Sequence, residues 1–397
     1  MYFFRREKIQ CRYQFSLRDA VDITLLQRAL TAALASAPYY TQRLVQEKRE
    51  MWLEPNTEPC LVYPGSTMRN IPEQTNGYLF CVSCEGDTVY FDWHHFLLDG
   101  HGVSPLLTSI LEQYCNLRYG TAFAVPQIVC DPPYDMEAML AEYPPVEYGS
   151  DVIQRDVVQT YEGALRRTRV CLSKQSLVEK ALANNAKPVS ALMGLLCMAM
   201  REYLGKEKIQ YSYSSDTRDV AGVPNALYSC VCSFGHTVQL QAQTRLADFV
   251  ADVDADIRRD LQPQSKRRRM TEQMGWVYQV YRQRASLKIK KRVFQMGEYI
   301  SGFPSDFWVS YQGDPFVPAD PDLEKYLTDF QTWVPADGAS IGVECTTLHG
   351  VITICIQNKA QNPGYAAALR HAFESAGVKV LEAAELGPSP YTSPYIP

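Results

Sequence analysis

The chain has 397 residues, of which 46% are hydrophobic and 21% charged, with a formal net charge of −5 at pH 7. This composition is typical of a globular protein with enough apolar material for two lobes, and it excludes collagen-like and low-complexity chains. The sequence contains no run of about eighteen apolar residues and no apolar core of a secretory signal near its start. It therefore predicts a cytoplasmic protein without a transmembrane segment.

The charge is distributed unevenly along the chain. Residues 266–292, here called the basic segment, contain ten basic residues and only one acidic residue, Glu272, although the chain as a whole is acidic. Such a run most often marks a solvated helical face. It would also suit the phosphates of coenzyme A, an acidic carrier protein or an anionic membrane surface. Nucleic acid is not an expected partner, because the rest of the chain is acidic and carries no nucleic-acid-binding motif.

The twelve cysteines lie mostly within apolar segments. Cys81 and Cys84 would lie on opposite faces of a strand, and Cys230 and Cys232 lack a second pair at zinc-binding spacing. We therefore expect reduced, buried thiols and no bound metal.

In the first part of the chain, alternation of apolar and polar residues predicts strands over residues 10–17, 78–84 and 88–93. The turn Glu85-Gly86-Asp87 joins the last two as a hairpin. One helix begins after Asp22, a candidate N-cap, and is stopped by Pro38. Another helix follows the hairpin, with apolar positions from Val103 to Leu111.

Residues 126–150 are rich in proline and tyrosine and predict a crossover between lobes. The elements expected after it are a strand at 167–173 with Ser173 as the next N-cap, a helix at 189–204 ended by Gly205, strands at 208–215 and 228–240, a hairpin at 340–358 turning at His349-Gly350, and a helix at 364–376. We expect an N-terminal lobe over residues 1–150, a C-terminal lobe over 151–386 and a disordered tail over 387–397.

The order of hairpin, connector and helix occurs twice, around residues 78–118 and 340–376. Only the first connector contains histidine. Two similar α/β lobes, of which one carries chemistry, would explain this difference.

One segment stands out chemically, the run from Asp92 to Gly100 (DWHHFLLDG), which directly follows an apolar strand. Histidine suits general-base chemistry because its ordinary pKa is about 6.5. Asp99 can fix the local backbone, and Gly100 permits a close approach that a Cβ would block. The alternative is that both histidines are ordinary core or surface groups and Asp99 only caps the following helix.

HHFLLDG matches the HHxxxDG motif and resembles the coenzyme-A-dependent acyltransferase superfamily. This group includes chloramphenicol acetyltransferase, the condensation domains of nonribosomal peptide synthetases, alcohol acetyltransferases and wax ester synthases. The likeness continues through HHFLLDGHGVSPLLTSILEQYC, and less specifically through residues 15–44 and 189–219. It implies a mixed α/β (α+β) fold of two chloramphenicol-acetyltransferase-like lobes with a substrate tunnel between them.

The resemblance also implies roles for individual residues. His95 would be the general base, acting without a covalent acyl-enzyme, with His94 in support. Asp99 would be structural and would pair with Arg218, in the segment SSDTRD. The alternative for Arg218 is an exposed charge at a strand end.

The segment DFWVSYQGDPF, residues 306–316, contains a WVSY run that resembles a serine-bearing strand of chloramphenicol acetyltransferase. The resemblance makes Ser310 a candidate oxyanion donor and Tyr311 and Gln312 candidate tunnel residues. In that enzyme the strand precedes the histidine motif, whereas here it follows it. A core strand with alternating faces is the alternative.

The leading hypothesis is an acyltransferase that moves an acyl group from a coenzyme A thioester to a hydroxyl or amine. No permanently bound cofactor is expected, since acyl-CoA or acyl-phosphopantetheine would be the donor substrate. The first alternative is a stand-alone condensation domain that uses substrates tethered to an acyl or peptidyl carrier protein. The second is a non-catalytic binding protein on the same fold.

Overall fold

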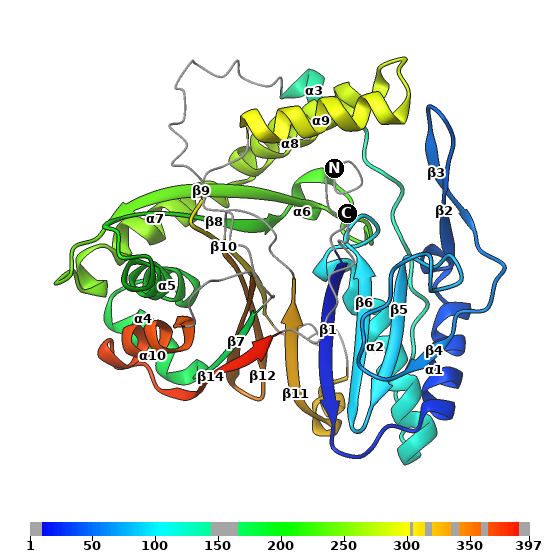
Figure 1. The fold of residues 1–397 in the computed structure, drawn as a ribbon, viewed down its shortest axis with the longest axis horizontal. Coiled ribbons are helices and arrows are strands. Elements are labelled where there is room, and N and C mark those ends of the chain that lie inside the picture. The colour runs from blue at the N-terminus through cyan, green and yellow to red at the C-terminus, as the bar shows by residue number, and fades with distance from the viewer. Residues whose placement is uncertain are drawn as a thin grey trace.

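The computed structural model describes residues 10–143, 166–301, 305–313, 320–334, 341–358 and 364–388. Two mixed sheets dominate these residues, a five-stranded sheet in the order β11-β1-β6-β5-β4 and a seven-stranded sheet in the order β14-β7-β13-β12-β10-β8-β9 (Figure 1). A small hairpin, β2-β3, stands apart from both.

The first sheet contains β1 (Gln10–Leu17), β4 (Val62–Pro64), β5 (Phe80–Glu85), β6 (Thr88–His94) and β11 (Leu327–Trp333). The second contains β7 (Arg166–Ser173), β8 (Lys208–Asp216), β9 (Val231–Gln239), β10 (Phe307–Gly313), β12 (Ile341–Leu348), β13 (Val351–Asn358) and β14 (Val380–Pro388). The separate hairpin consists of β2 (Gln42–Gln46) and β3 (Met51–Pro55).

The helices cover the two sheets separately. Helices α1 (Ile23–Ala35) and α2 (Gly100–Tyr119) share a core with the first sheet. A second core joins the larger sheet to α4 (Lys174–Ala183), α5 (Pro188–Leu204), α7 (Val250–Asp260) and α10 (Tyr365–Ser375). The remaining helical elements are α3 (Met136–Glu142), α6 (Arg218–Ala221), α8 (Pro263–Arg282), α9 (Leu287–Ser301) and the short 3₁₀ turns η2 (Pro38–Tyr40), η3 (Leu246–Asp248) and η4 (Pro321–Tyr326).

Local signals in the sequence explain where several of these elements begin and end. Asp22 caps α1 by accepting from the backbone N–H groups of Thr24 and Leu25. Gly205 ends α5 with a φ of 65°, in the left-handed region that favours glycine. The β12-β13 turn has positive φ at both His349 (50°) and Gly350 (72°), which matches the twist of a two-residue hairpin. These predicted elements are confirmed.

Strand β11 was not anticipated in the first sheet. It comes from residues 327–333, within the stretch expected to form the C-terminal lobe, yet it pairs antiparallel with β1, where Phe15 faces Phe330. It also contacts β12 and β13, so it connects the two sheets. The expected lobe boundary near residue 150 lies outside the described residues.

At the other end of the chain, β14 runs to Pro388 and so includes the first two residues of the expected tail. Residues 389–397 lie outside the described ranges.

The described part of the predicted crossover, residues 126–143, contacts segments on both sides of the expected lobe boundary. The N–H of Ile128 donates to the carbonyl of Ser36 in the first lobe, at 3.1 Å. Three residues later, the carboxylate of Asp131 accepts from the N–H of Asn225 in the second lobe, at 2.7 Å. The segment then forms α3, a helix that was not predicted, which packs against α8.

The basic segment forms most of α8 and the first part of α9, and it is not simply a solvated face. Lys266 is 7% exposed and pairs with Asp219, and Arg269 is 9% exposed and donates to the carbonyl of Ser233. Burial and pairing within the fold thus neutralise part of the charge that the sequence shows as a run.

All twelve cysteines are free thiols, and ten of them are buried, as the sequence predicts. Among the described residues, no helix is both long and apolar enough to cross a membrane.

Candidate active site

The histidine motif lies in the turn between β6 and α2. β6 ends at His94, which faces Gln10 of β1 in the centre of the first sheet, and α2 begins at Gly100. The five residues between them must leave the strand and start a helix, and Asp99 provides the N-cap for that helix. The turn is therefore defined at both ends by regular structure.

Asp99 is held by donors from both lobes. Its Oδ1 accepts from the N–H of Gly102 and from Nη2 of Arg218, each at 2.8 Å. Its Oδ2 accepts from the N–H of Cys230, also at 2.8 Å. Three charge-assisted bonds to one buried carboxylate fix its position closely.

Arg218 completes this connection within the second lobe. Its Nε donates to the carbonyl of Ala226 at 2.7 Å, and the residue is 3% exposed, like Asp99. Burial lowers the pKa of Arg218, but its negatively charged neighbours, Asp99 above all and then Asp216, raise the pKa overall. The structure thus brings together the Asp99–Arg218 pair that the resemblance implies.

His94 and His95 have different surroundings. His94 is 7% exposed, and its Nδ1 accepts from the N–H of Phe96 at 3.1 Å, so the proton of the neutral ring is placed on Nε2. His95 is partly exposed at the start of the turn. This difference suits His94 to shaping the turn and leaves His95 in reach of a small molecule.

Two further side chains hold the turn after His95. The hydroxyl of Tyr39 donates to the carbonyl of Leu97 at 3.0 Å, and the indole of Trp93 donates to the carbonyl of Leu98 at 3.2 Å. The backbone after His95 is therefore held by η2 and β6 of the first lobe as well as by the second lobe.

Gly100 and Gly102 are positions of close approach. A Cβ on Gly100 would lie 2.0 Å from Oε1 of Gln312, and one on Gly102 would lie 1.8 Å from the carbonyl oxygen of Leu227. Both contacts come from the second lobe, so the start of α2 packs directly against it. A Cβ at Gly100 would also lie 2.6 Å from the hydroxyl of Tyr13.

The three candidates on β10 divide between the two faces of that strand. Nε2 of Gln312 donates to Oγ of Ser310 at 2.7 Å, and Gln312 lies against Gly100. The intervening Tyr311 is 41% exposed, and its hydroxyl bonds to that of Thr347 at 3.2 Å. Gln312 is thus brought to the motif and Ser310 is joined to it through Gln312, whereas Tyr311 points to the opposite face.

Glu344 was missed by the sequence reasoning. It faces Ser310 across the parallel β10–β12 pair, hydrogen-bonds to that serine and is 3% exposed. Burial raises the pKa of Glu344 to about 8, and the bond to Ser310 opposes this only in part. The available signal was a single acid in the otherwise uncharged strand segment SIGVECTTL.

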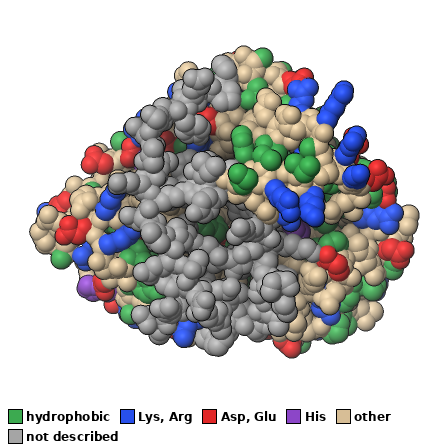
Figure 2. Space-filling model, turned by 45° about the horizontal axis from the view of Figure 1, so that its top comes forward, with side chains coloured by type: hydrophobic (Ala, Val, Ile, Leu, Met, Phe, Trp, Pro, Cys, Tyr) green, Lys and Arg blue, Asp and Glu red, His purple; other side chains and the backbone are tan. Residues whose placement is uncertain are grey.

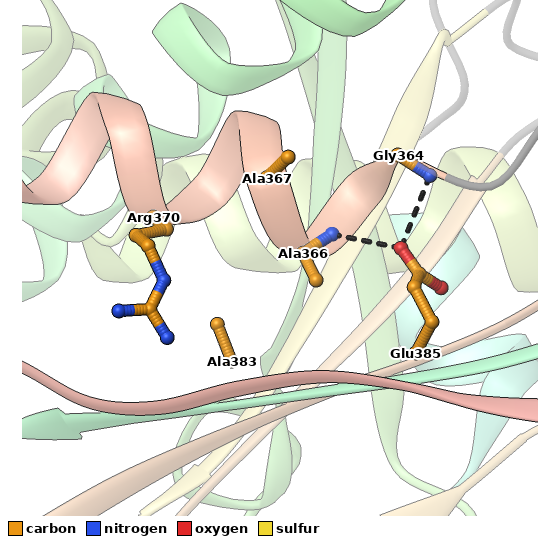
Figure 3. A pocket seen from close by; sticks show the side chains of 6 residues that line it. All are labelled: Gly364, Ala366, Ala367, Arg370, Ala383 and Glu385. Atoms are coloured by element: carbon orange, nitrogen blue, oxygen red, sulfur yellow. Dashed lines mark hydrogen bonds between the residues drawn. The ribbon is translucent and has the colours of Figure 1, made fainter.

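A cavity of about 450 Å³ lies elsewhere, between α10 and β14 (Figure 3). Its two charged lining residues are Arg370 and Glu385, and Oε1 of Glu385 accepts from the N–H groups of Gly364 and Ala366 at the start of α10. Because the fold itself occupies that carboxylate, and no predicted site residue lines the cavity, we assign it no role in the chemistry. Within the described ranges, no cluster of His, Cys, Asp and Glu is arranged to hold a metal.

Comparison with solved structures identifies the fold. The chain is similar to polyketide synthase associated protein 5 from Mycobacterium tuberculosis, with 16% identity, a TM-score of 0.63, and coverage of 93% of this chain and 94% of that one. It is also similar to the first condensation domain of the CDA synthetase, with 12% identity, a TM-score of 0.59 and 94% of each chain covered. TRI101 of F. sporotrichioides, solved with coenzyme A and T-2, shows 11% identity, a TM-score of 0.61 and 96% of each chain covered.

No protein-family model and no curated protein matches the sequence. The structural likeness nevertheless confirms the predicted fold, two chloramphenicol-acetyltransferase-like lobes of mixed α/β structure. Identities this low establish the fold alone.

Proposed function

We propose that the protein transfers an acyl group from a pantetheine thioester, in the simplest case acyl-CoA, to a hydroxyl or amine, with His95 as the general base. The observation that carries this proposal is the threefold attachment of Asp99. It fixes the turn bearing His95 to both lobes at the place where they meet. General-base chemistry requires such a fixed imidazole in reach of a substrate.

In the proposed reaction, neutral His95 removes the proton of the acceptor as its oxygen or nitrogen attacks the thioester carbonyl. The tetrahedral intermediate then collapses, the C–S bond breaks, and protonated His95 returns the proton to the leaving thiolate. The products are an ester or amide and a free thiol. No covalent acyl-enzyme is needed, because the base activates the acceptor directly.

Ser310 is the proposed donor to the oxyanion of the intermediate, with Glu344 and Gln312 setting the direction of its hydroxyl. A neutral Glu344 can donate its carboxyl proton to Oγ of Ser310, which also accepts from Gln312. The hydroxyl proton of the serine is then available to the substrate. An ionised Glu344 would instead accept that proton and withdraw it from the site.

Two versions of this function are open, and they differ in the acyl donor. TRI101 was solved with coenzyme A, which favours a free acyl-CoA. The equal likeness to a condensation domain favours a donor tethered to a carrier protein. Both versions use the same base, so only the donor distinguishes them.

The test is to incubate the protein with acetyl-, octanoyl- and palmitoyl-CoA and pooled alcohols and amines, and to follow free thiol. We expect acceptor-dependent release that His95→Ala reduces at least about a hundredfold, the usual contribution of a general base. His371→Ala is the matched control, because that histidine is exposed on α10 and paired with Glu202.

Turnover by His95→Ala close to that of the unmodified protein would refute the base assignment. Release only from carrier-tethered thioesters would support the condensation-domain version. No release from either kind of donor would leave the non-catalytic binding protein as the better hypothesis.

A further inference from the structure

Helix α9 is apolar on two opposite sides. Its inner side presents Leu287 and Phe294, which are 9% and 1% exposed, to α8 and to Met51 of β3. Lys290, on the same side, is 5% exposed and donates to the carbonyl of Arg49. This side is fully used in attaching α9 to the rest of the protein.

The opposite side of α9 carries a second apolar stripe that nothing described in the chain covers. Ile289, Val293 and Met296 are 53%, 45% and 64% exposed. Their spacing of four and three residues places them on one face of the helix. A helix that is apolar on both sides is normally buried on both, so this face is suited to a partner.

Basic side chains border the stripe. Lys288 and Arg292 are exposed, and they directly precede Ile289 and Val293 of the stripe in the sequence. Arg284 is exposed in the turn before α9. The sequence has no acidic residue between positions 273 and 297, although the whole chain carries a net charge of −5. Figure 2, in which the top of Figure 1 comes forward, shows hydrophobic side chains gathered on this face with Lys and Arg side chains beside them.

We propose that this outer face of α9, formed by Ile289, Val293, Met296, Lys288 and Arg292, docks the protein on an anionic lipid membrane surface. An amphipathic helix lying in the interface inserts its apolar stripe at the level of the headgroups, while its Lys and Arg side chains bind anionic lipid. The stripe here lies on the outside of a helix, not in a groove, which matches a planar surface.

A second copy of the chain fits this face less well. A twofold interface through α9 would place the same patch on both partners and bring Lys288 and Arg292 close to their own counterparts. Among the described side chains of α9, residues 287–296, none is acidic, so nothing there offsets the repulsion of these like charges. An anionic surface complements them instead.

The experiment is co-sedimentation of the full chain with vesicles of phosphatidylcholine alone or with about one third phosphatidylglycerol. We expect binding to the anionic vesicles only, weakened by salt. Lys288→Gln with Arg292→Gln should lower the affinity roughly thirtyfold, since each surface cation contributes about a factor of five. Ile289→Ser, Val293→Ser and Met296→Ser together should lower it at least about tenfold.

The controls are Leu182→Ser on α4, which is 71% exposed, and Arg245→Gln, whose side chain is 80% exposed. Both should bind vesicles as the unmodified protein does. Every substituted side chain is exposed, so folding should persist, and circular dichroism checks it.

No binding of the folded protein to anionic vesicles would overturn the proposal, and so would equal binding by the outer-face variants. Self-association that the three serine substitutions abolish would overturn it in favour of a dimer. The outcome does not depend on whether the protein turns over any thioester.

Discussion

Replacing Glu344 by glutamine separates the protonation state of this buried acid from its packing. The folded protein holds a proton on Glu344 up to about pH 8, whereas the ordinary pKa of the side chain is 4.5. Between these values the unfolded chain has released a proton that the folded chain keeps, so stability falls as pH rises. The slope is about 1.4 kcal/mol per pH unit and vanishes above the folded pKa.

Urea denaturation at pH 5.5, 6.5, 7.5 and 8.5 measures this effect. From pH 5.5 to 7.5 the unmodified protein should lose roughly 3 kcal/mol of unfolding free energy relative to Glu344→Gln. The control is Glu112→Gln, which removes a different buried acid, on α2, whose pKa is also raised by burial. This variant keeps Glu344, so it should keep the part of the pH dependence that Glu344→Gln removes. Parallel stability curves for the unmodified protein and Glu344→Gln would refute the reasoning.

The same substitution tests the proposed role of Glu344 in catalysis. A glutamine amide can donate to Ser310 at any pH, so Glu344→Gln should keep its turnover above pH 8, where that of the unmodified protein declines. An alkaline decline that persists in Glu344→Gln would show that Glu344 does not orient Ser310.

Three further outcomes follow from the contacts of the motif. Asp99→Asn should cost about 3–5 kcal/mol of unfolding free energy in urea, because it leaves the buried Arg218 without its main partner. The double variant Asp99→Asn with Arg218→Met should lose less unfolding free energy than the sum of the two single losses, by more than about 1 kcal/mol. Strictly additive losses would show that the two residues are not coupled. Gly102→Ala should destabilise by about 2 kcal/mol or more, since its methyl group meets the backbone oxygen of Leu227 at 1.8 Å. Gly100→Ala should cost less, because its methyl group first meets the end of the Gln312 side chain, which can move, and not a backbone atom. A loss as large as that of Gly102→Ala would contradict this reasoning.

Much of the secondary structure was predictable because its signals are local. Asp22 and Gly205 act within one turn of their own helices, and the His349-Gly350 turn depends on its own two residues. The turn that bears the histidine motif was also identifiable, since its histidines, Asp99 and Gly100 lie within seven residues. Such features depend little on which distant segments pack against them.

The prediction failed where a residue's role depends on a distant neighbour. An alternating strand such as β11 fits either sheet equally well by its own pattern, and its pairing with β1 spans more than three hundred residues. The sequence of the basic segment revealed its charge but not that Lys266 and Arg269 are buried. Their partners, Asp219 and the carbonyl of Ser233, lie far from them in sequence.

The sequence by itself determined the turn that bears His95, the caps of the main helices and the alternation of the strands, because each depends on residues a few positions apart. Only the tertiary structure decided that Glu344 faces Ser310 and that Gln312 meets Gly100. Parallel pairing of β10 with β12 and the approach of the two lobes create these contacts. Neither leaves a periodic or compositional trace in the chain, since each requires two segments whose separate patterns are those of ordinary buried strands.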